Sequence, residues 1–257
     1  MNIHPMPNLN AAAAGERESV AAARRWAIDQ ALPLWATTGF DAVRGGFQER
    51  LNLDGSADLS CPRRTMVQAR QIYVYSHAAI LGWHPDAKQI VLRGLDFMQS
   101  ACHAPDGAPG YVHMLTANGE IADATRDTYD HAFVLLALAW AARATGDRQI
   151  HGLIDGALAF LDEHLTHADG AFYESMPTRL PRRQNPHMHV LEAMLALHEN
   201  VAHVQALPRA RRIVALLEDR FLDAQTQTLR EFFDEDWRPL PGAAGDHIEP
   251  GHHAEWS

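Results

Sequence analysis

The sequence has few cysteines, no long apolar run and a deficit of positive charge, and each shortage argues against a class of protein. Its two cysteines, Cys61 and Cys102, fall in predicted helical stretches without metal-ligand spacing, so we expect buried thiols of a reducing compartment. No stretch approaches the ~18 consecutive apolar residues of a membrane span. With 22 Lys and Arg against 32 Asp and Glu, the net charge of −10 argues against nucleic acid or an anionic membrane as the main partner.

The N-terminal segment also lacks the pattern of a secretory leader. No basic stretch precedes an apolar one, and the alanine run at residues 11–14 is too short and too weakly apolar to insert. We therefore expect a cytoplasmic protein. What the chain does have is the apolar content of a globular core, 47% of residues, and 16 histidines, some of which must serve structure rather than chemistry.

An aromatic motif recurs along the chain with a period near sixty residues. Phe47, Tyr111, Phe172 and Phe233 are spaced by 64, 61 and 61 residues, and each follows an amphipathic helical pattern and precedes a more apolar one. The expected first helices of the pairs cover 16–36, 84–103, 147–166 and 207–223. The expected second helices cover 62–81, 127–145, 187–204 and a start at 251. Short extended pieces at 47–53, 110–115, 171–175 and 229–234 could pair as small hairpins.

The alternation predicts an all-α fold, an α/α toroid whose inner helices line a central pocket. An open α-solenoid is the alternative. The toroid is favoured because the inner helices carry polar residues at comparable depth, as a shared cavity requires. A closed ring would need roughly 360 to 400 residues at this period, so about four of six repeats are present. We expect a flexible N-terminus at 1–15 and one partial barrel domain at 16–257.

The first two inner helices carry polar residues in apolar surroundings. Arg70 is costly there unless it is paired or bound, so it is either a donor to substrate oxygens or one half of a salt bridge to Asp130 or another inner carboxylate. Tyr129 points a hydroxyl into the pocket or bonds to backbone. Asp130 and His131 are expected to brace neighbouring helices, and the second inner helix is expected to begin at an Asp127 or Thr125 cap.

The third and fourth inner helices concentrate histidine. Asn185 is expected as an N-cap, and His189 shares its helix face. His187 and His189 diverge by about 200° on a helix, which disfavours a zinc site, and no metal is expected. His252 and Glu255 share one face, so Glu255 is expected to orient His252 for proton transfer. The neighbouring His253 is expected to be structural.

Four of these segments together resemble the N-acylglucosamine 2-epimerase superfamily. They are Gln68–Tyr73, Tyr129–Phe133, Asn185–Ala193 and Gly251–Trp256. The likeness runs from about Arg44 to the last residue. It implies an (α/α)6 barrel that needs no metal or cofactor, acts on a small sugar, and transfers protons through a ring-opened form and a cis-enediolate.

The resemblance also implies roles for individual residues. Arg70 would contact oxygens near the reacting carbons, Asn185 and His189 would bind hydroxyls, and Tyr129 would be a pocket contact. His252 would be a general acid/base with Glu255 as its partner. The segment around Arg70 leans toward the aldose–ketose isomerase branch, of mannose–fructose type.

The resemblance places a second catalytic histidine on the last inner helix, beyond residue 257. We therefore expect a C-terminally truncated chain that is marginally stable and inactive by itself. Whether the protein is a monomer or a homodimer stays open.

Three other functions remain under consideration. A 2-epimerase of the N-acylglucosamine or cellobiose type would return the proton to the same carbon from the opposite face. A glycoside hydrolase on the same toroid would need two carboxylates about 5 to 10 Å apart, and the candidates Asp130 and Glu255 both lie beside histidines. The third is an inactive or carbohydrate-binding fragment.

Overall fold

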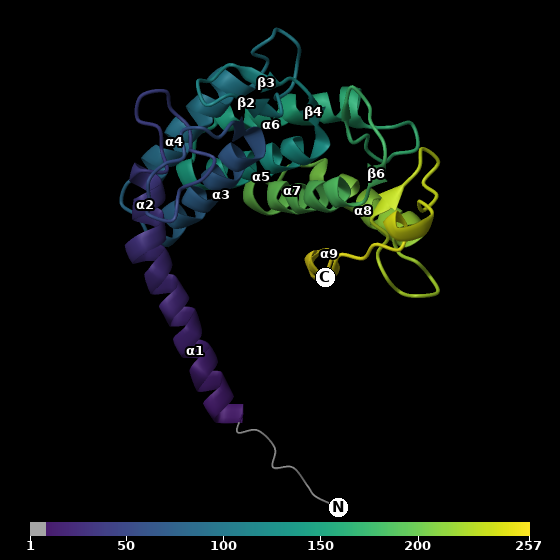
Figure 1. Ribbon diagram of the computed structural model, residues 1–257, viewed down its shortest axis with the longest axis horizontal. Helices are drawn as coiled ribbons and strands as arrows, with labels where there is room; N and C mark the ends of the chain where they lie inside the picture. The colour runs from purple at the N-terminus through teal and green to yellow at the C-terminus, as the bar shows by residue number, and fades with distance from the viewer. Residues whose placement is uncertain (1–8) are drawn as a thin grey trace, which may run out of the picture.

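The computed structural model describes the backbone from residue 9 to 257 and the side chains from residue 18 onward. Helices dominate and form two layers of an arc, which confirms the predicted all-α repeat architecture (Figure 1). The outer helices are α1 (Leu9–Trp26) with α2 (Leu32–Thr37), α4 (Ala87–Phe97), α6 (Gln149–Phe160) and α8 (Ala206–Leu216). The inner helices are α3 (Thr65–Leu81), α5 (Thr128–Thr145), α7 (Asn185–Val201) and α9 (Pro250–Glu255).

The first outer helix begins earlier than expected and projects from the body of the molecule. It starts at Leu9 rather than near residue 16, and a π-helical turn, Ala27–Ala31, joins it to α2. Figure 1 shows α1 extending away from the packed helices. Residues 1–8 of the segment expected to be flexible lie outside the described residues.

Helix α5 is the centre of the inner layer. It packs against both α3 and α7, which explains why its sequence is apolar almost all round. The Asp127 side chain accepts a hydrogen bond from the backbone N–H of Tyr129 and caps the helix, as predicted. At its other end α5 stops at Gly146, whose φ of +71° suits a glycine.

Short strands link consecutive repeats rather than closing local hairpins. Those that immediately precede inner helices are β1 (Arg63–Arg64), β4 (Arg126–Asp127) and β6 (Arg182–Arg183). They pair antiparallel with β2 (Met114–Leu115), β5 (Ser175–Met176) and β7 (Phe232–Phe233). Among the strands of the described residues, β2 and β3 (Ile121–Asp123) form a hairpin of the expected local kind. Helices α3, α5 and α7 are therefore each anchored at their start by the following repeat.

Every described repeat uses the same hydrogen bond from a loop backbone N–H to an inner-helix side chain, and the bond is buried in the first three repeats. The pairs are Phe47 with Gln68 (2.6 Å), Tyr111 with His131 (3.1 Å), Phe172 with His187 (2.9 Å) and Leu229 with His253 (3.2 Å). The fourth repeat is thus in register at Leu229, four residues before Phe233, and the expected alignment on Phe233 is corrected. We call the four accepting side chains, Gln68, His131, His187 and His253, the bracing layer.

Two bracing histidines are fully buried and neutral. Burial lowers the pKa of His131 to about 4 and that of His187 to about 3. In each ring Nδ1–H donates to the backbone oxygen four residues earlier, so Nε2 is free to accept. The predicted structural role of His131 is confirmed.

Several local expectations are corrected. Asn185 is the first residue of α7, and Gln184 occupies the N-cap position without a side-chain cap bond. Cys61 lies in a bend and is half-buried, whereas Cys102 is buried at the end of a π-helical turn, where burial raises its pKa to about 12.

A small second core positions the last helix. It lies beneath the loops after α8 and consists of Ala171, Leu216, Phe221, Leu229, Phe233 and Trp237. Trp256 of α9 packs against this cluster and against the main core.

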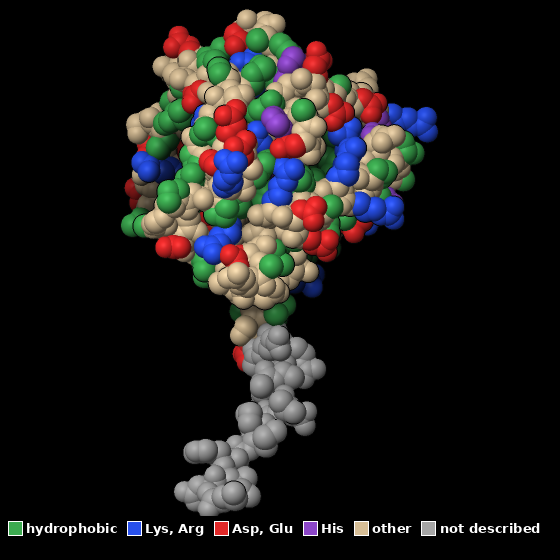
Figure 2. Space-filling view, turned by 90° about the vertical axis from the view of Figure 1, so that its right-hand side faces the viewer, with side chains coloured by type: hydrophobic (Ala, Val, Ile, Leu, Met, Phe, Trp, Pro, Cys, Tyr) green, Lys and Arg blue, Asp and Glu red, His purple; other side chains and the backbone are tan. Residues whose placement is uncertain are grey.

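Within residues 9–257 no helix is both long and apolar enough to cross a membrane. On the described part of the face in Figure 2, acidic and basic side chains are interspersed without a continuous basic patch.

Candidate active site

A polar cavity of about 470 Å³ lies where the inner helices begin. Its described lining comprises Arg64, Met66, Arg70, His113, Asp127, Tyr129, Arg179, Arg183 and Asn185. Met66, Tyr129 and Asn185 each stand two positions before a bracing side chain of their own repeat. The repeat therefore brings Arg70, Tyr129 and Asn185, all predicted from sequence, to one cavity.

Arg70 contacts Tyr129 and does not pair with Asp130. Its Nη2 donates to the Tyr129 hydroxyl at 2.8 Å, and the guanidinium lies 4.1 Å from the centre of the Phe133 ring. Burial raises the pKa of Tyr129, so the phenol is neutral and its own proton remains available to a ligand. Of the two roles left open for Arg70, the salt bridge to Asp130 is therefore excluded.

His189 lies beside this pair and is almost buried, with 8% exposure. Its ring packs edge-on against Tyr129 with centroids 4.8 Å apart. Nδ1 lies 2.9 Å from a carboxylate oxygen of Glu192, and Nε2 lies 3.9 Å from one of Glu255. Glu255 thus faces His189, and its expected pairing with His252 is corrected.

His252 is oriented by Glu231, a residue that the sequence analysis missed. The Nδ1 atom lies 3.0 Å from both carboxylate oxygens of Glu231, which is buried. On the other side of the ring, Asn185 Nδ2 lies 3.1 Å from Nε2. A carboxylate at Nδ1 holds the Nδ1–H tautomer and leaves Nε2 as the basic atom. The signal for Glu231 was its position two residues after Leu229, which matches Glu49 and Glu174 in earlier repeats.

Further hydrogen bonds fix Glu231 in place. Gln184 Nε2 donates to Glu231 Oε2 at 2.9 Å, and the indole N–H of Trp256 donates to Gln184 Oε1 at 2.7 Å. Trp256, four positions after His252, thus ties the end of α9 to the start of α7. This arrangement restricts the imidazole to one orientation, which proton transfer at a fixed carbon requires.

A second carboxylate–imidazole pair at the cavity was also missed. His113 lines the cavity, and its Nδ1 lies 2.7 Å from Asp130 Oδ2. Burial raises the pKa of Asp130 to about 6, and the hydrogen bond to Asp130 raises the pKa of His113. Asp130 is fully buried, so it cannot touch a substrate and acts only through His113.

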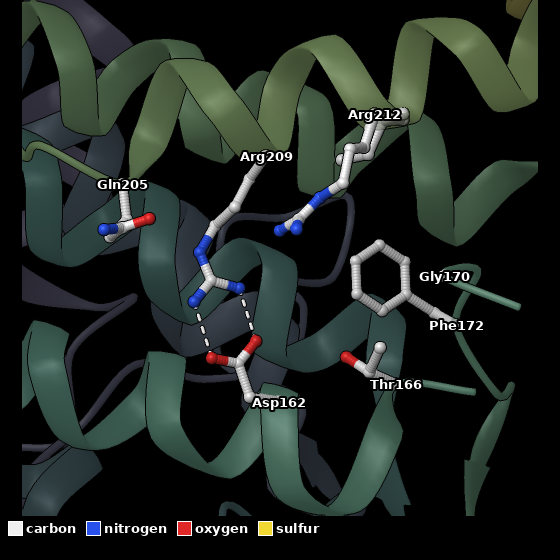
Figure 3. A pocket seen from close by; sticks show the side chains of 8 residues that line it. Asp162, Thr166, Gly170, Phe172, Gln205, Arg209 and Arg212 are labelled. Atoms are coloured by element: carbon white, nitrogen blue, oxygen red, sulfur yellow. Dashed lines mark hydrogen bonds and ion pairs between the residues drawn. The ribbon is translucent and has the colours of Figure 1, made fainter. Parts of the chain in front are cut away.

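Other hollows do not collect the predicted residues. The lining residues of a cavity of about 380 Å³ on the outer face are drawn in Figure 3, where Arg209 of α8 forms a two-pronged ion pair with Asp162, and Arg212 extends into the same hollow. This ion pair ties neighbouring outer helices together. Within residues 9–257, no group of three or more His, Cys, Asp or Glu side chains could hold a metal ion.

Sequence comparison matches residues 45–257 to the family described as N-acylglucosamine 2-epimerase (GlcNAc 2-epimerase). A relative named mannose-6-phosphate isomerase, from Rhizobium meliloti, is 39% identical over 236 residues, which are 90% of this chain and 60% of that protein. The chain therefore spans about 60% of the length of that relative.

Two solved structures share the fold. The cellobiose 2-epimerase of Spirochaeta thermophila superposes with a TM-score of 0.81 at 20% identity and covers 97% of this chain and 69% of its own. A D-mannose isomerase also gives 0.81, at 22% identity, over 91% of this chain and 62% of its own. These likenesses confirm the predicted (α/α)6-type architecture, and the sequence match over residues 45–257 shows that the chain belongs to the N-acylglucosamine 2-epimerase family.

Proposed function

We propose that the protein interconverts an aldose and the corresponding ketose, with His252 as a general acid/base. The observation that carries the proposal is the Glu231–His252 pair, which Asn185 links to the cavity that also presents Arg70. An imidazole held in one tautomer is a suitable general base for removal of a proton next to a carbonyl. The relatives named mannose-6-phosphate isomerase and D-mannose isomerase support this reaction class.

The substrate reacts in its open-chain form. His252 Nε2 takes the proton from the carbon next to the carbonyl, and the resulting cis-enediolate carries negative charge on its oxygens. Arg70 stabilises that charge, and the hydroxyl of Tyr129 supplies a second donor. Asn185 and His189 bind hydroxyls, and Glu255, which faces His189, acts through that ring. Return of the proton to the neighbouring carbon, together with transfer of the hydroxyl proton from one enediolate oxygen to the other, completes the isomerisation.

A 2-epimerase reaction would start from the same intermediate, and relatives named cellobiose 2-epimerase keep it as the second candidate. It requires a proton donor on the opposite face of the enediolate. The hydrolase alternative loses support because Asp130, one of its two candidate carboxylates, is fully buried against His113. Cytoplasmic location, a monomeric or homodimeric state and the inactivity of the 257-residue chain by itself stay predictions from the sequence.

The test is to incubate the protein with mannose in D₂O and to follow the products by NMR. Fructose with deuterium at the proton-transfer carbon is expected. Glucose as the first product would instead identify a 2-epimerase. Because the 257-residue chain is expected to be inactive by itself, the assay uses the full-length protein. The proposed function is wrong if that protein forms neither the ketose nor the 2-epimer from mannose or mannose 6-phosphate.

A further inference from the structure

The cavity at the inner-helix ends carries more positive charge than an uncharged sugar requires. Arg64, Arg179 and Arg183 line it in addition to Arg70. Among the described lining residues, the sole carboxylate is that of Asp127. Arg70 already serves the enediolate in the proposed reaction, so the other three arginines have no assigned role.

Each of the three arginines is held by a carboxylate that is more deeply buried than the arginine itself. The pairs are Arg64 with Glu49, Arg179 with Asp127 and Arg183 with Glu174. The carboxylate side chains are 10%, 5% and 1% exposed, whereas the arginine side chains are 45%, 51% and 32% exposed. The carboxylates therefore fix the arginines from behind, and guanidinium groups form the surface that a ligand meets.

Strand geometry explains why two of these arginines face the cavity. Successive side chains of a strand point to opposite sides. In β1 and β6 the first arginine, Arg63 or Arg182, is buried at 3% exposure, and the second, Arg64 or Arg183, lines the cavity. The same device in two repeats thus supplies two cations, and Arg179 comes from the segment between β5 and β6.

The guanidinium groups keep unused donors. Arg183 binds Glu174 through its backbone N–H and Nε, and its two Nη groups have no hydrogen-bond partner among the described residues. Arg179 uses one Nη for Asp127. Sugar hydroxyls accept single hydrogen bonds from such donors, whereas phosphate oxygens satisfy several at once through shorter, charge-assisted bonds in the planar geometry that arginine favours.

We propose that the substrate is a phosphorylated aldose whose phosphoryl group is bound by Arg64, Arg179 and Arg183. The proposal rests on the proposed function for the chemistry at the other end of the sugar. Asn185 joins the two regions because it lines the cavity and contacts His252 Nε2. His113, which lines the same cavity beside Arg64, adds a group able to carry positive charge.

The test compares the binding of mannose 6-phosphate, mannose and inorganic phosphate by titration calorimetry. We expect the phosphate ester to bind more tightly than mannose, and inorganic phosphate to compete with it. The substitution Arg179→Ala should weaken ester binding by about 10- to 100-fold, which is what lost hydrogen bonds to a charged group amount to, and should leave mannose binding within about twofold. Arg212→Ala, in the outer cavity of Figure 3, is the matched control and should change neither.

Arg179→Lys is a second variant that keeps the test decisive if the alanine variant fails to fold. Lysine keeps a positive charge beside Asp127 but loses the planar fork, so an intermediate weakening is expected. The proposal is overturned if mannose binds as tightly as its 6-phosphate, or if both Arg179 variants behave like Arg212→Ala.

Turnover separates this proposal from the proposed function. Arginine-dependent binding of mannose 6-phosphate without conversion of either sugar would leave the phosphate site standing and refute the isomerase. If the protein converts mannose but its Arg179 variants bind mannose 6-phosphate normally, the isomerase proposal stands and the phosphate site is refuted.

Discussion

His252 and His253 are neighbours on α9, yet they belong to two different regions of the molecule. His253 belongs to the bracing layer and accepts a backbone hydrogen bond from Leu229, whereas His252 lies between Glu231 and the cavity-lining Asn185. On α7, His187 and His189 divide in the same way. The comparison teaches that position in the repeat, rather than residue type, decides whether a histidine serves stability or chemistry.

The largest expected effect is a difference in activity between two glutamine substitutions, one at His252 and one at His253. His252→Gln removes the proposed general base and should lower kcat/KM by about 10²- to 10⁴-fold, the usual contribution of a positioned acid/base group. His253→Gln should keep most activity, because Gln68 performs the same bracing role in the first repeat. Kinetics with the converted sugar, together with thermal melts, provide the measurement. Equal losses in the two variants would erase the distinction.

Glu231 tests whether the carboxylate behind the ring matters as the geometry indicates. Glu231→Gln should lower kcat by roughly 10²-fold, the lower end of that same range, because the tautomer of His252 is no longer enforced. The pH–rate profile should shift as well, which a purely structural role would not cause. Glu255→Gln is the control and should cost less, since Glu255 faces His189. A greater loss for Glu255→Gln would restore the partner expected from sequence.

Substitutions in the bracing layer should instead lower the unfolding free energy. His187→Ala leaves the buried N–H of Phe172 without its acceptor and opens a cavity, so unfolding free energy should fall by about 2–4 kcal/mol. His187→Gln should recover part of that loss by analogy with Gln68. Urea denaturation followed by circular dichroism measures both. Our account of the layer fails if the alanine variant unfolds at the same urea concentration as the parent.

The smallest expected effect is the pH dependence of stability that arises from the buried histidines of the bracing layer. The folded pKa values of His131 and His187, about 4 and about 3, lie below the ordinary value of 6.5. The unfolded chain therefore binds protons first, and the contribution to stability is complete above pH 6.5 and declines as pH falls toward 4 and then 3. Asp130 acts in the opposite sense, because burial raises its pKa to about 6.

The effect of the buried imidazole is therefore measured as the difference between the parent and His187→Gln in the pH dependence of the unfolding free energy. The parent should lose more unfolding free energy between pH 6.5 and 4 than the variant does, measured by urea titration at each pH. Parallel losses would show that the buried imidazole does not titrate as proposed.

Much of the fold followed from residue patterns. The period near sixty residues located four outer and four inner helices, and the apolar surface of residues 129–140 correctly indicated a helix buried between two others. The strand pairing was missed because two-residue strands carry too little alternation to reveal a partner in another repeat. The fourth repeat was misaligned because Leu229 holds a place that aromatic residues hold elsewhere.

The candidate site was partly predictable. Arg70, Tyr129 and Asn185 lie where the inner-helix pattern placed them, at one cavity. Glu231 was missed because helix spacing pointed to Glu255, and a carboxylate on a loop is invisible to a test of helix faces. The roles of Glu49 and Glu174 behind the cavity arginines were hidden for the same reason.

The amino-acid sequence by itself determined the helical repeat and the kinds of side chain that meet at the inner-helix ends, because both depend on local periodicity. Only the tertiary structure decided the partners, namely Glu231 for His252, Glu255 for His189 and buried carboxylates for three arginines. Those pairings join residues from different repeats and loops. They are set by how whole helices and strands pack, which no local spacing encodes.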